Sequence, residues 1–165
     1  MRLVIILVGI LNASAGFAQE DIQFTDMASQ KCSEEAISDV ERASCIGASA
    51  GLCIEKSNGQ RIERALCTVA ETKYWDDRLS AVYRALQLAY AEGDVDRAID
   101  FSTPYPRGLA MQEMQRAWME YRDLRCQFEA AQWGSMPSAG LMEVECLLRV
   151  TGEQALYLEV QPGDL

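Results

Sequence analysis

The sequence of 165 residues contains no histidine. Histidine is the commonest general base and the commonest metal ligand among the side chains, so its absence excludes a Ser-His-Asp triad, a Cys-His pair and a zincin site. A P-loop, a Rossmann fingerprint, a nucleophile elbow and a calcium-binding loop are missing as well. We therefore expect no enzyme, and neither a cofactor nor a bound metal ion.

Positive charge is also scarce, because 15 Lys and Arg residues stand against 25 Asp and Glu residues. The formal net charge of −10 argues against a nucleic-acid partner, since nucleic-acid binding depends on Lys and Arg side chains that neutralise phosphates. An acidic surface instead attracts basic proteins and speeds their encounter.

Long apolar runs are absent except at the N-terminus. Arg2 is followed by an apolar run over residues 3–11 and then by small residues that end at Ala18. This order is typical of a secretory signal peptide, so we predict a signal over residues 1–18 that is cleaved before Gln19. The run is shorter than the ~20 apolar residues that span a bilayer. The sequence thus predicts a periplasmic or secreted protein without a membrane span, whose net charge becomes −11 once Arg2 is lost.

The chain has six cysteines, all of which follow the predicted signal. They are Cys32, Cys45, Cys53, Cys67, Cys126 and Cys146. No two of them have the close C-x-x-C spacing of zinc or redox sites, so an exported chain favours three structural disulfides. Cys126 and Cys146 flank a Gly/Ser/Pro stretch that can fold back on itself, and we predict that they pair. The other four then pair among themselves in an order that the sequence leaves open.

Proline is infrequent, with four residues, and good helix formers dominate the chain after the signal. The pattern predicts an all-α fold with helices over residues 27–44, 46–56, 60–92, 109–132 and 139–159. Gly93 is expected to end the longest helix, in the position after a helix that suits glycine. The stretch 94–108 reads as an insertion between two helices.

Two long apolar stripes are expected to form the core. They contain Trp75, Leu79, Val82, Tyr83, Leu86 and Tyr90 on one helix, and Met111, Met114, Trp118, Tyr121 and Phe128 on the other. Burying them against each other predicts a small disulfide-stapled antiparallel helical bundle. The expected organisation is an N-terminal helical extension over 19–56, a helical domain over 57–160 and a tail over 161–165. An alternative use of the stripes is a ligand slot lined by Trp75, Trp118 and Tyr121.

The charged residues near the stripes do not form a pattern typical of acid–base catalysis. Asp76 and Asp77 are adjacent on a helix and point about 100° apart, so they do not converge as an acid–base pair. Arg122 is instead expected to reach a carboxylate of the long helix, such as Asp76, in a structural ion pair.

Two sequence blocks carry a family resemblance. The first, over 74–83, contains Trp75, Asp76, Leu79 and Tyr83, and the second, over 115–126, contains Gln115, Trp118, Arg122, Asp123 and Cys126. With Gly134-Ser135, Cys146 and residues 151–158, these blocks resemble the lysozyme-inhibitor LprI-like family of small secreted bacterial proteins over residues 53–158. The chain departs from the family pattern at Ser80, where asparagine is usual, at Gln154, where arginine is usual, and in the longer stretch 94–108.

The resemblance implies a small exported helical protein whose block residues have a structural or binding role. It implies lysozyme or another basic cell-wall hydrolase as the partner, bound and inhibited through an acidic helical surface. The alternative is a structural or stress-related envelope protein with a different partner and no lysozyme role.

Overall fold

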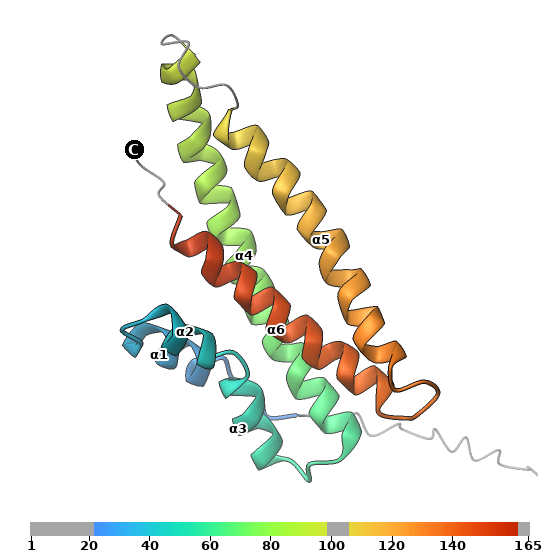
Figure 1. Ribbon diagram of the computed structural model, residues 1–165. Helices are drawn as coiled ribbons and strands as arrows, with labels where there is room; N and C mark the ends of the chain where they lie inside the picture. The colour runs from blue at the N-terminus through green and yellow to red at the C-terminus, as the bar shows by residue number, and fades with distance from the viewer. Residues whose placement is uncertain (1–21, 99–105, 162–165) are drawn as a thin grey trace, which may run out of the picture.

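The computed structural model describes residues 22–98 and 106–161, and the regular elements in these residues are all helices (Figure 1). They are α1 (Met27–Glu35), α2 (Asp39–Ser44), α3 (Ala48–Lys56), α4 (Arg61–Ala98), α5 (Arg107–Ala131) and α6 (Ala139–Glu159). The all-α prediction is confirmed. The predicted signal over 1–18 lies outside the described residues, as do most of the 161–165 tail and part of the 94–108 stretch.

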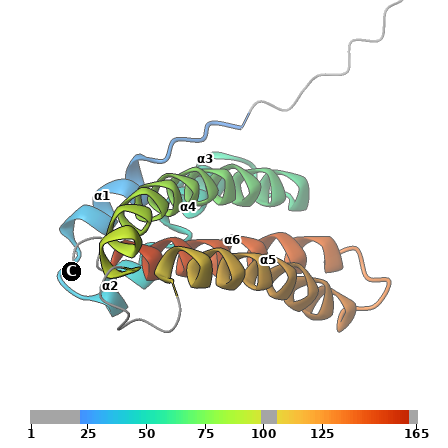
Figure 2. The same ribbon diagram turned by 90° about the horizontal axis from the view of Figure 1, so that it is seen from above.

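Three long helices form the body of the molecule (Figures 1 and 2). Arg64 of α4 lies beside Glu145 of α6, and Arg78 beside Glu159, so α6 runs in the same direction as α4. The helix α5 runs the opposite way, since Arg107 at its start contacts Asp94 near the end of α4. Helices that follow one another along the chain therefore run in opposite directions, as in the predicted antiparallel bundle. Within the described residues, no helix combines the length and apolar character that crossing a membrane requires.

Three disulfides staple the bundle. Cys126 of α5 pairs with Cys146 of α6 across the loop between them, as predicted, with the two Cα atoms 5.4 Å apart. The order that the sequence left open is Cys32 with Cys45, which ties α1 to the end of α2, and Cys53 with Cys67, which ties α3 to α4. Each closed loop restricts the unfolded chain and so stabilises the fold, by about 2–4 kcal/mol in the chain-entropy account.

The core contains one of the predicted stripes and only part of the other. Trp75, Leu79, Leu86 and Tyr90 of α4 are buried, as is Met111 of α5. The prediction that Tyr121 and Phe128 join this core is wrong, because their side chains are 55% and 68% exposed. The reason is that α5 packs more extensively against α6 than against α4, so Tyr121 and Phe128 are not buried against the α4 stripe.

The N-terminal segment differs from its prediction. In place of one helix over 27–44 there are two, separated at Ala36-Ile37-Ser38. Ser38 caps the start of α2 by accepting a hydrogen bond from the Glu41 N–H at 3.2 Å, and the Glu41 carboxylate accepts one from the Ile37 N–H at 2.7 Å. This S-x-x-E capping pattern satisfies backbone donors that a continuous helix would bond within itself.

The prediction that Gly93 ends the longest helix is also wrong, since α4 continues to Ala98. A glycine inside a helix costs only about 1 kcal/mol. Asp94, the next residue, offsets this cost. Its carboxylate accepts hydrogen bonds from the backbone N–H groups of Arg107 (3.1 Å) and Gly108 (2.8 Å) at the start of α5. The remaining predicted bounds agree with α3, α5 and α6 to within two residues.

A buried carboxylate joins the N-terminal helices to the bundle. Glu71 of α4 is 0% exposed and accepts four hydrogen bonds. The donors are the Ser29 hydroxyl (2.6 Å), the Gly47 N–H (2.8 Å), the Ala50 N–H (2.6 Å) and the Trp75 indole N–H (2.9 Å). Two of these donors are otherwise unpaired backbone groups at the start of α3. Glu71 thus caps α3, fixes α1 and orients the central tryptophan.

We expect Glu71→Gln to lower the free energy of unfolding by roughly 3 kcal/mol, because an amide offers one acceptor oxygen and leaves buried donors unpaired. Urea unfolding with the disulfides intact measures the loss. The matched control is Glu120→Gln on the exposed side of α5, which should change stability by less than about 0.5 kcal/mol. Equal stability of the two variants would contradict the role assigned to Glu71.

Candidate functional site

The residues of the two sequence blocks mainly hold the long helices together. Trp75 and Leu79 lie in the core. Gln115 of α5 is buried and accepts a hydrogen bond at 3.0 Å from Gln154 of α6, the position where the family pattern has arginine. These side chains fix the spacing of the bundle.

Arg122 makes the polar link between α4 and α5. Its guanidinium stacks over the Trp118 ring, 5.2 Å from the ring centre, and its Nε donates to the Asp123 carboxylate at 2.8 Å. Its Nη1 lies 4.0 Å from Oδ1 of Asp76, so the expected Arg122–Asp76 contact is present. Asp76 and Asp123 are both more than half exposed, and ion pairs at such positions contribute little to stability.

Two hollows lie on either side of this link. The first, here called the Trp118 hollow, has a volume of about 440 Å³ between α4 and α5, and six of the nine named block residues line it. These are Asp76, Leu79, Tyr83, Gln115, Trp118 and Arg122. The second, here called the Thr151 hollow, has a volume of about 330 Å³ and shares Asp76 and Arg122 with the first. The structure therefore gathers these six residues around one hollow, while Trp75 lies in the core.

The alternative ligand slot is not formed. Trp75 is fully buried and hydrogen-bonded to Glu71, while Trp118 and Tyr121 line different hollows. The faces of these three rings therefore do not meet around one space.

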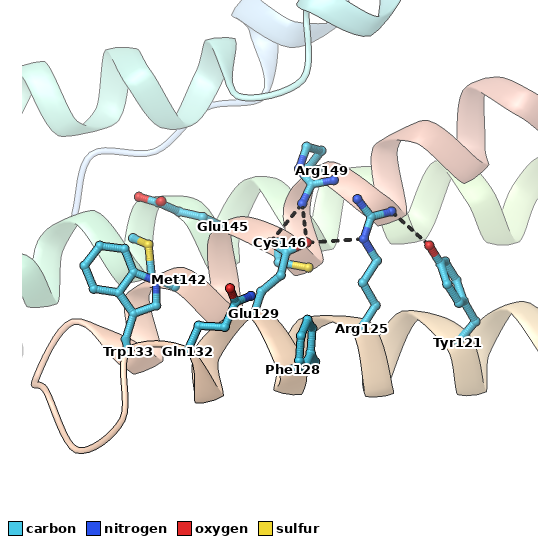
Figure 3. A pocket seen from close by; sticks show the side chains of 10 residues that line it. All are labelled: Tyr121, Arg125, Phe128, Glu129, Gln132, Trp133, Met142, Glu145, Cys146 and Arg149. Atoms are coloured by element: carbon cyan, nitrogen blue, oxygen red, sulfur yellow. Dashed lines mark hydrogen bonds and ion pairs between the residues drawn. The ribbon is translucent and has the colours of Figure 1, made fainter.

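A third and larger hollow, here called the aromatic hollow, lies between α5 and α6 near the Cys126–Cys146 disulfide (Figure 3). Its volume is about 600 Å³, and Tyr121, Phe128 and Trp133 contribute exposed rings to it. The sequence does not reveal this hollow, because Tyr121 and Phe128 have the spacing of core residues. Tyr, Trp and Arg side chains dominate binding energy at protein interfaces, and the aromatic hollow contains all three.

A charged network joins α5 and α6 at the aromatic hollow (Figure 3). Arg149 of α6 donates to both oxygens of the Glu129 carboxylate, at 2.9 and 3.0 Å, and Arg125 donates to the same carboxylate at 3.2 Å. These hydrogen bonds, that from Arg149 above all, hold the pKa of Glu129 below its ordinary value. The Arg125 guanidinium in turn donates to the Tyr121 hydroxyl. The network fixes the Tyr121 ring and the two guanidinium groups relative to one another.

Exposed carboxylates lie at a different place, on α1 and α2, where Lys31 and Arg42 offset part of their charge. Glu34, Glu35, Asp39 and Glu41 are exposed there, beside Ile37 and Val40, whose side chains are 90% and 81% exposed. We call these residues the acidic edge. Among the described residues, no group of three or more Cys, Asp or Glu side chains is placed to hold a metal ion.

The sequence is similar to known proteins. The family model "Lysozyme inhibitor LprI" matches residues 53–158. The chain is 30% identical over 132 residues to the "Uncharacterized 17.7 kDa protein in puhA 5'region" of Rhodobacter capsulatus, which covers 78% of this chain and 80% of that protein. No solved structure matches the chain.

The charged network leads us to predict how Glu129 titrates in acid. Because the folded-state pKa of Glu129 is lowered, its contribution to stability is complete above the ordinary carboxyl pKa and is lost as the pH falls through the lowered value. Arg149→Gln should raise the pKa of Glu129, as followed by the NMR shift of its carboxyl carbon. The pKa of Asp94, lowered first by the Gly108 N–H, should stay unchanged in the same variant. An unaltered Glu129 titration would contradict the assigned cause.

Proposed function

The chain belongs to the lysozyme inhibitor LprI family, and from this premise we propose that it is exported and that it binds and inhibits lysozyme or another basic cell-wall hydrolase. The sequence contains no histidine and no recognised catalytic motif. A role that depends on binding through a complementary surface is consistent with this composition. The family match covers α4, α5 and α6 almost completely, so we assign the contact surface to these helices.

The aromatic hollow is the proposed contact surface, because its aromatic rings are exposed. Phe128 is 68% exposed, Tyr121 55% and Trp133 42%, whereas large apolar side chains of a monomer usually gain by burial. Arg125 and Arg149 add cations that are already oriented by Glu129. A preorganised surface loses little side-chain freedom when a partner binds, which favours affinity.

The acidic edge has a different role in this proposal. The net charge of −11 after removal of residues 1–18 attracts a basic enzyme over a distance, and the acidic edge concentrates exposed carboxylates on α1 and α2. The aromatic hollow itself is lined by two cations and two carboxylates, so its contribution is apolar contact rather than net charge. Attraction and contact are thus assigned to separate parts of the chain.

The proposed organisation follows from the same premise. Residues 1–18 act as the signal and are removed before Gln19. The segment 19–56 is an extension that Glu71 and the Cys53–Cys67 disulfide fasten to the bundle, and 57–160 is the domain that carries the contact surface. The three disulfides suit an oxidising compartment such as the periplasm.

A lytic assay with lysozyme and the purified chain from residue 19 onward tests the function. We expect inhibition, and Phe128→Ala should weaken it about thirtyfold, the effect of losing about 2 kcal/mol at an interface. Leu88→Ala on α4 is the control, because its side chain is similarly exposed (70%) but lies away from the aromatic hollow. Absence of inhibition at a large molar excess, together with absence of a complex at low salt, would overturn the function. Equal inhibition by the two variants would overturn only the assigned surface.

The acidic edge is tested by association kinetics. Replacing Glu34 and Glu35 with Gln and Asp39 with Asn should lower the association rate constant several-fold at low salt and leave the dissociation rate constant unchanged. The difference from the unmodified chain should disappear at high salt, where exposed charges are screened. A change confined to dissociation would show that the acidic edge contacts the enzyme directly.

A further inference from the structure

The outward side of α5 carries an apolar stripe, here called the α5 seam. It consists of Ala117, Tyr121, Leu124, Phe128 and Ala131. The three large side chains are 55%, 58% and 68% exposed in this order, and both alanines are exposed as well. The buried face of α5, with Cys126, lies on the other side of the helix, and Figure 1 shows α5 along one edge of the bundle. The α5 seam is therefore an apolar helix face that the described helices leave in water.

The spacing of the α5 seam fits the side of another helix. Its residues follow one another at steps of four, three, four and three, so they lie in one line along α5. This is the a/d repeat of helices that pair by inserting side chains between those of a partner helix. The repeat runs for two heptads, which is about 21 Å of helix.

The sizes of the seam residues make the stripe complementary to itself. Its small residues stand at the two ends and its large ones between them. When a second α5 runs antiparallel, with a two-fold axis between Tyr121 and Leu124, these two residues lie opposite each other in both directions. Phe128 of each copy then lies opposite Ala117 of the other. Large residues facing small ones are what lets two apolar surfaces interdigitate.

The charge around the α5 seam is balanced, although the chain as a whole is acidic. Over residues 116–132 three cations stand against three anions. They are Arg116, Arg122 and Arg125, and Glu120, Asp123 and Glu129. Two copies thus meet at the seam without a local excess of one charge. The net charge of −11 on each chain without residues 1–18 still repels the copies at longer range, where salt screens it.

We propose that two copies of this chain form an antiparallel dimer through the α5 seam. With about 200 Å² for each large side chain, the exposed fractions leave roughly 300 Å² of apolar surface per copy on Tyr121, Leu124 and Phe128. Two copies then bury about half of the ~1,200 Å² at which standard interfaces begin, before the flanking side chains are added. This area predicts a weak, concentration-dependent dimer.

The dimer also regulates the surface assigned to the hydrolase, a consequence that rests on the proposed function. Tyr121 and Phe128 belong both to the α5 seam and to the lining of the aromatic hollow. A second copy and a hydrolase therefore compete for the same rings. The single chain is the form that inhibits, and the dimer is a reserve whose binding surface is covered.

Sedimentation equilibrium of the purified chain from residue 19 onward, without any hydrolase, tests the dimer. We expect the dimer fraction to rise from under a tenth at about 5 µM to over half at about 500 µM, as for a small interface. Leu124→Glu should raise the dissociation constant at least tenfold. Leu88→Glu on α4 is the control, because it adds the same charge at a similarly exposed side chain (70%) and should change the constant less than twofold. A monomer throughout this range, or equal dimer fractions in the two variants, would overturn the proposal.

Salt and NMR measurements test the basis and the direction of the pairing. The dimer should tighten as sodium chloride rises, because its contact is apolar and the opposing repulsion is screened. In a mixture of carbon-13-labelled and unlabelled chains, we expect intermolecular NOEs between the Phe128 ring and the Ala117 methyl group. A dimer that weakens with added salt, or NOEs that join Phe128 to Phe128 of the other copy, would refute this arrangement.

Adding excess lysozyme to the dimer separates this inference from the proposed function. We expect the dimer fraction to fall, with a complex that contains one copy of the chain. A complex that contains both copies of the dimer would overturn the competition. If the chain dimerises through the seam and yet inhibits no hydrolase, the dimer stands and the proposed function fails.

Discussion

The Glu71 carboxylate inside the fold is the interaction on which the arrangement of the other elements depends. Four donors from α1, the start of α3 and Trp75 converge on it, and it is fully buried. A buried carboxylate is tolerated only when its hydrogen bonds are complete, so α1, α3 and α4 must meet in one geometry. The disulfides then need only hold neighbouring elements together, while Glu71 sets how the N-terminal helices lie against the bundle.

Structural and binding roles fall on different residues of the same helices. The block residues Trp75, Leu79 and Gln115 are buried and set the spacing of α4, α5 and α6. The exposed rings Tyr121 and Phe128 lie outside the core, around a charged network that is complete without a partner. Sequence features that define the family therefore describe mainly how the bundle is built.

Much of the fold could be predicted from the sequence, and the errors have identifiable causes. The bounds of α6 and the Cys126–Cys146 pair follow from local signals, a break rich in Gly, Ser and Pro and a helix of good formers. The break at Ser38 was also encoded locally, in its capping pattern with Glu41, but helical composition on both sides concealed it. Gly93 was misleading because its weak local preference is overridden by Asp94, whose partners lie on another helix.

The sequence by itself determined the chemical class of this protein: no histidine, six cysteines, an acidic chain and helices with apolar stripes. Composition and periodicity are local properties, so they state what chemistry is available and which residues share a helix face. They do not state whether another element covers that face. Only the tertiary structure decided that Tyr121 and Phe128 stay in water and that Glu71 lies at the centre of a buried network. Each of these depends on contacts between helices far apart in the chain.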